Sequence, residues 1–175
     1  MKECKLEVYL GERFVGTMAQ TADRRVAFAY SEEWLDNGFA ISPFSLPVEQ
    51  KVFVPTSQAF SGLWGVFADS LPDAWGQLLG DRMLKARGIL SADMTQLERL
   101  AIVGDSGMGA LSYRPAWNIQ QDAGIDDLDE LSAQCHAILN HEDAGNLDEL
   151  FQMGGSSGGA RPKIMTDEWI IKFPA

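Results

Sequence analysis

GGSSGGARPK, residues 154–163, is the stretch around which this chain of 175 residues is organised. Glycine has no Cβ and accepts positive φ, so such a loop exposes backbone N–H groups and lets the chain pass close to a ligand. Phosphate is a common ligand of loops of this kind. The same composition is also typical of a flexible linker, and composition alone does not choose between the two.

Two short apolar segments after the loop are expected to pair as a hairpin. Residues 161–165 and 169–173 predict strands, and residues 166–168 predict the turn between them. With the hairpin centred on Asp167, Lys172 lies opposite Pro162, and its ammonium returns to the mouth of the loop. A register slip of one residue would flip the faces. A linker is usually followed by another domain, so this single hairpin favours the phosphate loop.

The loop differs from the two best-known phosphate motifs. No Gly-Lys-Ser or Gly-Lys-Thr closes it, and its glycines do not follow the Gly-x-Gly-x-x-Gly spacing of dinucleotide sites. A glycine loop between strands, with a lysine on the next strand, is instead the arrangement that kinases place over ATP phosphates.

Composition restricts the class of protein. A hydrophobic content of 46% suffices for one packed domain, or for a domain plus a further segment. There is no apolar run of about 18 residues and no apolar signal-peptide region at the start, so we expect a cytoplasmic protein. Cys4 and Cys135 form no metal or disulfide pattern and predict reduced thiols. The net charge of −11 argues against direct nucleic-acid binding, though not against DNA contact through a basic partner.

The first part of the chain predicts a small antiparallel β unit. Strands are expected at residues 4–10, 13–18 and 25–30, with Gly11-Glu12 as the first turn. Ser31 is expected to cap a short helix that stops at Gly38.

Helices are expected in the middle of the chain. The first begins with Ser70 as its N-cap and ends at Gly88, and the second begins at Ser91 or Asp93 and ends at Gly104. A strand follows at residues 110–114, and the polar residues 120–127 mark a boundary. The last helix carries an apolar face, formed by Leu128, Leu131, Cys135, Ile138 and Leu139. The fold class is therefore α+β, a small antiparallel β unit packed with helices.

Other candidate sites have simpler interpretations. His136 and His141 lack neighbours of ligand spacing, so a packing or surface role is favoured over a metal site. Asp69 and Asp73 flank a helix start, which favours capping over paired-carboxylate catalysis. Residues 104–109, GDSGMG, suit a tight turn as well as an anion site.

At this point the motifs resemble the HipA family, bacterial serine/threonine kinases that are often toxins of type II toxin–antitoxin pairs. The resemblance rests on FSGL at 60–63, FADSLPDAWG at 67–76 and GALSYRP at 109–115. It continues in GGSSGGARPK and in IIKFP at 170–174. The motif order is kept over most of the chain. The resemblance implies a HipA-like N-terminal subdomain at 1–120, then a linker helix and the beginning of a kinase-like N-lobe at 121–175.

The resemblance also implies roles for the residues of the loop. Lys172 would contact ATP phosphates, and the loop would cover them. The nucleotide-binding positions are Gly155, Ser156, Ser157, Gly158, Gly159, Ala160 and Lys172. Ser156 resembles the serine that some members autophosphorylate, with Ser157 as the neighbouring alternative, and the added charge would repel ATP. Arg161-Pro162 departs from the Gln-Glu of some members, and Lys163 matches in place without a clear role.

Phosphoryl transfer also needs a catalytic-loop aspartate, an asparagine and a metal-binding aspartate. In the family these lie downstream of the lysine, and this chain ends three residues after Lys172. We therefore expect an N-terminal piece with no catalytic residue and no metal ligand, inactive alone and without tight nucleotide binding. For the intact kinase the resemblance implies ATP, Mg²⁺ and a HipB-like DNA-binding antitoxin. It also implies a protein substrate, which is an aminoacyl-tRNA synthetase in several members, and it leaves dimerisation open.

Two other classes of protein remain open. One is a non-catalytic interaction module that binds and regulates a separate kinase or antitoxin. The other is an unrelated small β-barrel binder with a glycine-rich tail. The glycine loop and Lys172 favour the kinase region, because an interaction module would not need them.

Overall fold

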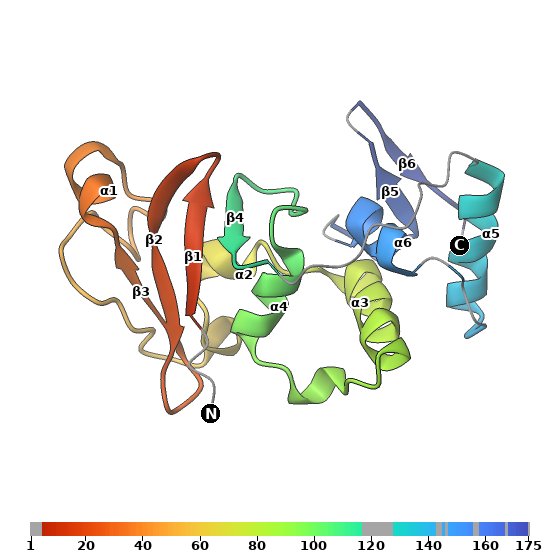
Figure 1. The fold of residues 1–175 in the computed structure, drawn as a ribbon, viewed down its shortest axis with the longest axis horizontal. Coiled ribbons are helices and arrows are strands. Elements are labelled where there is room, and N and C mark those ends of the chain that lie inside the picture. The colour runs from red at the N-terminus through yellow and green to blue at the C-terminus, as the bar shows by residue number, and fades with distance from the viewer. Residues whose placement is uncertain are drawn as a thin grey trace. The chain divides into compact units, whose positions relative to one another are not determined.

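The structure is a computed structural model that describes residues 5–116, 128–142, 145, 147–155, 158–166 and 168–174. Its helices and antiparallel strands confirm the α+β class (Figure 1). In chain order the elements, with η for 3₁₀ helices, are β1 (Lys5–Leu10), β2 (Arg13–Gln20), β3 (Val26–Tyr30), α1 (Glu32–Asn37), η1 (Ala59–Gly62), α2 (Gly65–Ala68), α3 (Ala74–Ala86), η2 (Ser91–Asp93), α4 (Gln96–Val103), β4 (Leu111–Arg114), α5 (Leu128–Leu139), α6 (Leu147–Gly154), β5 (Lys163–Met165) and β6 (Ile170–Lys172).

Packing divides the chain into two compact units. The first unit comprises Met1–Leu71 and Met94–Trp117, and the second comprises Pro72–Asp93 and Asn118–Ala175. The segment with α3 therefore packs with the end of the chain, and the division at residue 120 stays a prediction. Several expected features lie outside the described residues: Cys4, the boundary at 120–127, Ser156, Ser157 and the turn centre Asp167.

The first unit is built on a four-stranded antiparallel sheet of order β3-β2-β1-β4 (Figure 1). Alternation places every second side chain on one face, and directly opposed residues share a face. Leu6 lies opposite Met18, and Met18 lies opposite Phe28. On the other side of β1, Val8 lies opposite Tyr113 of β4. All five side chains are buried, so this row is the centre of the core.

Two of the expected local signals are confirmed. Leu10 pairs with Arg13 across the turn at Gly11-Glu12, where Gly11 has a φ of 58°. The Ser31 hydroxyl accepts a hydrogen bond of 3.1 Å from the Trp34 N–H and so caps α1.

The expected caps of the next two helices are wrong. Ser70 does not begin α3, because it belongs to the turn after α2, where its N–H donates to Phe67 O. Its buried hydroxyl accepts a 2.7 Å hydrogen bond from Tyr113 instead. The second helix, α4, begins after Thr95 rather than at Ser91 or Asp93, which form the 3₁₀ turn η2.

Thr95 and Glu98 satisfy each other's backbone as a capping box. The Glu98 N–H donates to the Thr95 hydroxyl at 3.2 Å, and the Thr95 N–H donates to the Glu98 carboxylate at 2.8 Å. The helix ends as expected at Gly104, whose φ is 54°. Gly104 O then accepts from Tyr113 N–H at 2.9 Å, so the GDSGMG segment forms a turn into β4.

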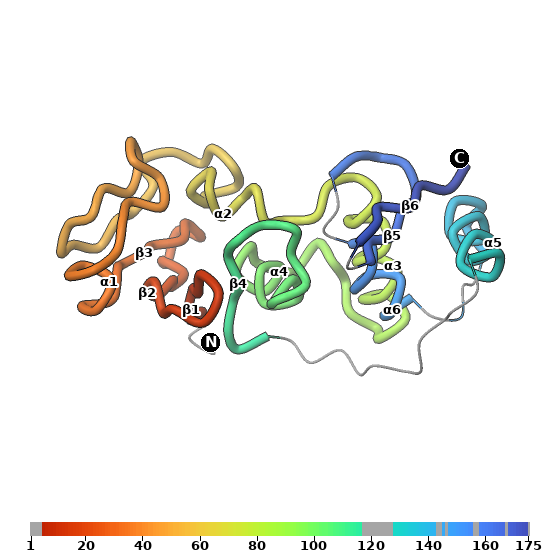
Figure 2. The backbone as a smooth tube through the Cα atoms, turned by 90° about the horizontal axis from the view of Figure 1, so that it is seen from above, coloured from red at the N-terminus to blue at the C-terminus, as the bar shows by residue number. Residues whose placement is uncertain are grey.

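The second unit contains α3, α5, α6 and the β5–β6 hairpin. On helix α5 the expected apolar face is confirmed for Leu131, Cys135 and Ile138, which are buried, but not for Leu128, which is 49% exposed. Burial raises the pKa of the free Cys135 thiol to about 11, so the thiol is neutral at ordinary pH. Helix α6 was not expected, and it packs against α3 and β5, as Figure 2 shows. Among the described residues, no helix is both long enough and apolar enough to cross a membrane.

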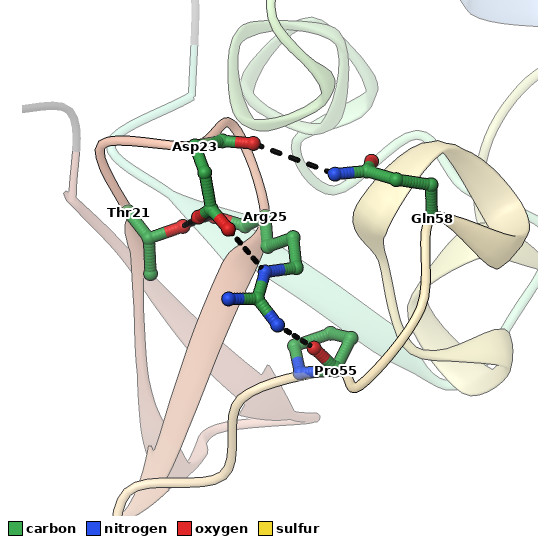
Figure 3. Close-up of polar contacts among 5 residues, drawn as sticks. All are labelled: Thr21, Asp23, Arg25, Pro55 and Gln58. Atoms are coloured by element: carbon green, nitrogen blue, oxygen red, sulfur yellow. Dashed lines mark hydrogen bonds and ion pairs between the residues drawn. The ribbon is translucent and has the colours of Figure 1, made fainter.

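A polar cluster holds the β2–β3 turn in the first unit (Figure 3). The Thr21 hydroxyl donates to Asp23 Oδ1 at 2.6 Å, and Arg25 Nε donates to Asp23 Oδ2 at 2.7 Å. Arg25 also donates to Pro55 O, while Gln58 Nε2 donates to Asp23 O at 3.4 Å. The cluster therefore joins the turn to the segment before η1.

The same place carries an unusual backbone conformation. Phe60, Ser61 and Gly62 have consecutive positive φ values of 51°, 57° and 81°. A Cβ on Gly62 would lie 3.1 Å from Arg24 O, so this position requires glycine for both conformation and space. The FSGL motif is thus a left-handed turn seated against the β2–β3 turn.

We predict that Gly62→Ala destabilises the first unit by about 2 kcal/mol or more, because strain at positive φ adds to crowding. Gly11→Ala is the matched control. Gly11 also has positive φ but has open space around it, so only the strain of about 1 kcal/mol applies. Urea denaturation of both variants measures the difference, and equal losses of stability would contradict the steric explanation.

We also predict that the free energy of unfolding decreases as pH rises from 10 toward 12. Burial raises the pKa of Tyr113 from 10 to about 12, against a smaller lowering by the hydrogen bond to Ser70. The folded state holds the phenol proton of Tyr113 more tightly than the unfolded state does. Its contribution to stability is therefore complete below pH 10 and is lost progressively as the pH rises through 12. Two pKa units correspond to about 2–3 kcal/mol.

Urea denaturation between pH 9 and 11.5 tests this dependence. Tyr113→Phe is the control, and it should show a shallower decline. The residual slope would include Tyr30, whose pKa burial also raises. Parallel pH profiles for the two proteins would show that Tyr113 does not titrate as expected.

Candidate functional site

The β5–β6 hairpin places two lysines opposite each other. Lys163 pairs with Lys172, and Ile164 pairs with Ile171. The expected pairing of Lys172 with Pro162 is therefore wrong by one residue. The cause is the turn, in which the Thr166 N–H donates to Trp169 O at 2.9 Å and sets the pairing. Because opposed residues share a face, both lysine side chains leave the hairpin on the same side.

The strands are also shorter than residues 161–165 and 169–173. Pro162 has no N–H, so it can only accept, and its carbonyl receives the Phe173 N–H at 2.9 Å. Ladder pairing is confined to Lys163–Met165 and Ile170–Lys172.

Lys163 lies buried beneath the glycine loop. Only 3% of the residue is exposed, and its ammonium donates a 2.9 Å hydrogen bond to Gly159 O. Burial lowers the pKa of Lys163, Asp73 counteracts this by attraction, and the nearby charge of Lys172 adds to the lowering. Lys172 itself is exposed. The hairpin thus provides one buried and one exposed cation on one face.

The glycine loop has two kinds of residue. Gly154 is the last residue of α6, and the buried Gly155 closes that helix by donating to Phe151 O at 2.7 Å. Gly158, Gly159 and Ala160 are exposed, and Gly159 has a φ of 106°. These three residues are called the glycine turn below. Among the expected nucleotide-binding positions of the loop, these three are described and exposed.

The first turn of α3 packs directly against this loop. Trp75, 1% exposed, donates from Nε1 to Lys163 O at 3.2 Å. A Cβ on Gly76 would overlap the carbonyl oxygen of Gly155, so only glycine permits this approach. The FADSLPDAWG motif therefore supports the glycine loop from a position about 80 residues earlier in the chain.

Asp73 completes the arrangement. It occupies the N-cap position of α3, but its side chain makes no capping hydrogen bond. Its Oδ2 lies 3.8 Å from the point where a Cβ on Gly158 would stand. Its Oδ1 is buried and has no hydrogen-bond partner within the described part of the chain. The expected capping role is therefore wrong for Asp73, and Asp69 ends α2 rather than beginning α3.

These groups suit a phosphate. The exposed glycine turn can present backbone N–H groups, and Lys163 and Lys172 provide two positive charges on one face of the hairpin. The charge of Lys172 disfavours the charged form of Lys163, and an added anion would relieve that repulsion. Sequence reasoning missed Asp73 and Gly76 as neighbours of the loop, because no local pattern signals a contact over such a separation.

His136 is partly buried on α5, and His141 is exposed just after that helix. His141 Nδ1 lies 2.8 Å from Arg82 Nη2, and the same guanidinium group donates to Ile138 O at 3.1 Å near the end of α5. Within the described ranges there is no group of three or more His, Cys, Asp or Glu side chains that could hold a metal ion.

Comparison with known proteins identifies the first part of the chain. Residues 6–114 match the family model of the HipA N-terminal domain. No curated protein matches. A solved structure of HipA in complex with HipB and operator DNA, a toxin–antitoxin system of Shewanella oneidensis MR-1, is 15% identical with a TM-score of 0.45.

That structural match covers 97% of this chain and 38% of the Shewanella chain, so the sequence spans less than half of that protein's length. The family match ends at residue 114, before the glycine loop. The candidate site is therefore supported by its own geometry and not by the family match.

The packing of α3 on the loop gives a direct prediction. Gly76→Ala should destabilise the second unit by about 1–3 kcal/mol, because a backbone carbonyl cannot move aside as a side chain can. Gly80→Ala is the control in the same helix. Its Cβ would meet only the Phe151 ring at 3.2 Å, and alanine favours the helix by about 1 kcal/mol. Urea denaturation measures both, and a Gly76→Ala protein as stable as Gly80→Ala would refute the close approach.

Proposed function

The chain belongs to the HipA family, since the HipA N-terminal domain spans more than half of it, and on this premise we propose that it is the N-terminal region of a HipA-like serine/threonine protein kinase. The glycine turn and the lysine pair would be its share of the ATP site. The observation that carries the proposal is the opposition of Lys163 and Lys172 on one face of the hairpin, next to the glycine turn.

The residues present suit the phosphates of ATP. Lys172 is exposed, so its ammonium is accessible to a phosphate. The glycine turn can bring backbone N–H groups near the same phosphate, because Gly158 and Gly159 carry no side chain to block the approach. ATP supplies the phosphoryl group that a kinase transfers. No residue of this chain is assigned to Mg²⁺.

In the whole protein, we further propose the toxin role in a type II toxin–antitoxin system, with a HipB-like DNA-binding antitoxin as partner. Family membership supports this. The net charge of −11 suits a protein that reaches DNA only through a partner. A protein substrate, of which an aminoacyl-tRNA synthetase is one candidate, and autophosphorylation at Ser156 or Ser157 belong to the same proposal.

A binding experiment tests the nucleotide part. The chain should bind ATP weakly in isothermal titration calorimetry, and Lys172→Met should weaken binding about tenfold, as expected for the loss of one charge-assisted contact. Lys85→Met is the matched control, because Lys85 is an exposed lysine of the same unit at the end of α3. It should bind like the unmodified chain.

The same experiment separates the two classes of function. No ATP binding at millimolar concentrations, or equal effects of Lys172→Met and Lys85→Met, would contradict the nucleotide site. A chain that binds an antitoxin or a separate kinase, but no nucleotide, would instead be the non-catalytic interaction module.

A further inference from the structure

Burial of the Lys163 ammonium needs an explanation that the proposed ATP contact of Lys172 does not give. A charged group loses hydration when it is buried, and the loss is tolerated only where the charge is compensated. Lys163 is 3% exposed, and its ammonium donates a hydrogen bond to the carbonyl of Gly159. That carbonyl belongs to the residue with a φ of 106°, in the middle of the glycine turn.

Compensating charge comes from the N-cap position of α3. Asp73 attracts the Lys163 ammonium and favours its charged form, while Lys172 opposes it. The carboxylate also borders Gly158, with Oδ1 buried and without a partner among the described residues. Its position at the N-cap of α3 places Asp73 beside the turn.

We propose that Lys163 is the positioning residue of the glycine turn, and that Asp73 acts through Lys163 by balancing its charge. In this arrangement the α3 segment sets the conformation in which the turn meets a phosphate. The hydrogen bond by which Lys163 holds the glycine turn is called the clamp below. The role of the turn as a phosphate site rests on the proposed function, whereas the clamp does not. Lys163 holds a carbonyl of the turn, so it acts through the backbone, and Lys172 remains the group that contacts the ligand.

The clamp matters because glycine is conformationally permissive. A free Gly158-Gly159 segment samples many conformations, and ordering it on binding costs about 1–2 kcal/mol per residue. In a turn that is already held, this entropy is lost on folding rather than on binding. Its backbone N–H groups are therefore preorganised for an anion.

Backbone ¹⁵N relaxation of the chain without nucleotide tests the clamp. The amides of Gly158, Gly159 and Ala160 should have order parameters near those of rigid backbone, about 0.85. In Lys163→Met they should fall below about 0.6, the range of flexible backbone. Lys172→Met should leave them unchanged, because the hydrogen bond to the Gly159 carbonyl comes from Lys163. Protected amides in β5 and α6 show that the second unit is still folded.

Asp73→Asn supplies a second variant that keeps Lys163 in place. It should lower the same order parameters, by less than Lys163→Met does. In the double variant, Asp73→Asn should add nothing further, because it acts only through Lys163. An unchanged turn in both single variants, or an equal loss of order in Lys172→Met, would overturn the proposal. Additive effects would overturn the part assigned to Asp73.

ATP titration of the same variants distinguishes the two proposals. If the turn loosens but the unmodified chain binds no ATP, the clamp stands and the nucleotide site fails. If the unmodified chain binds ATP and Lys163→Met neither loosens the turn nor weakens binding, the clamp fails and the nucleotide site stands. When both hold, Lys163→Met should weaken ATP binding about tenfold, consistent with a turn that must be ordered on binding.

Discussion

The absence of a side chain at Gly76 is the constraint on which the second unit depends. It allows the first turn of α3 to lie against the Gly155 carbonyl, and the contact brings Trp75 within hydrogen-bonding distance of Lys163 O. Helix α6 and strand β5, the two elements that flank the glycine loop, are thereby fixed to the same helix. Two motifs separated by about 80 residues are therefore one structural feature, which gives a physical reason for them to occur together.

The positive charge near the glycine turn follows from the register of the β5–β6 hairpin. The register that pairs Lys163 with Lys172 places two cations on one side of the hairpin, and the carboxylate of Asp73 offsets the charge of Lys163. In a partly buried site this imbalance is larger than it would be in water, because the effective dielectric constant is lower. An anion at the glycine turn would reduce it. The first unit has its own glycine-dependent feature in the FSGL turn, where a Cβ on Gly62 would lie 3.1 Å from Arg24 O.

Local signals predicted much of the fold. Period-two alternation located the three N-terminal strands, and Ser31 located the start of α1, because both depend on residues close in sequence. The Thr95-x-x-Glu98 capping box was equally local and was overlooked in favour of Ser91 or Asp93. Helix α6 was also missed, although Leu147, Leu150 and Phe151 have helical spacing, because the nearby glycines suggested an interruption.

What the sequence did not predict depends on tertiary contacts. The pairing of β1 with β4 joins residues about 100 positions apart, and nothing local signals it. The register of the hairpin depends on the length of its turn, which differs by one residue from the expected length. As a result Lys163, rather than Pro162, lies opposite Lys172. Lys163 and Asp73 could not be placed at the glycine turn from spacing, because their proximity follows from the packing of α3.

If the glycine turn is a phosphate site supported by α3, an ATP titration followed by amide chemical shifts should locate the ligand there. The amides of Gly158, Gly159 and Ala160 and those of strands β5 and β6 should shift, while the resonances of the β1–β4 sheet stay unmoved. Inorganic triphosphate should shift the same amides, because the phosphates are the group recognised. An absence of shifts at the glycine turn at saturating ATP, or shifts confined to the first unit, would contradict the phosphate site.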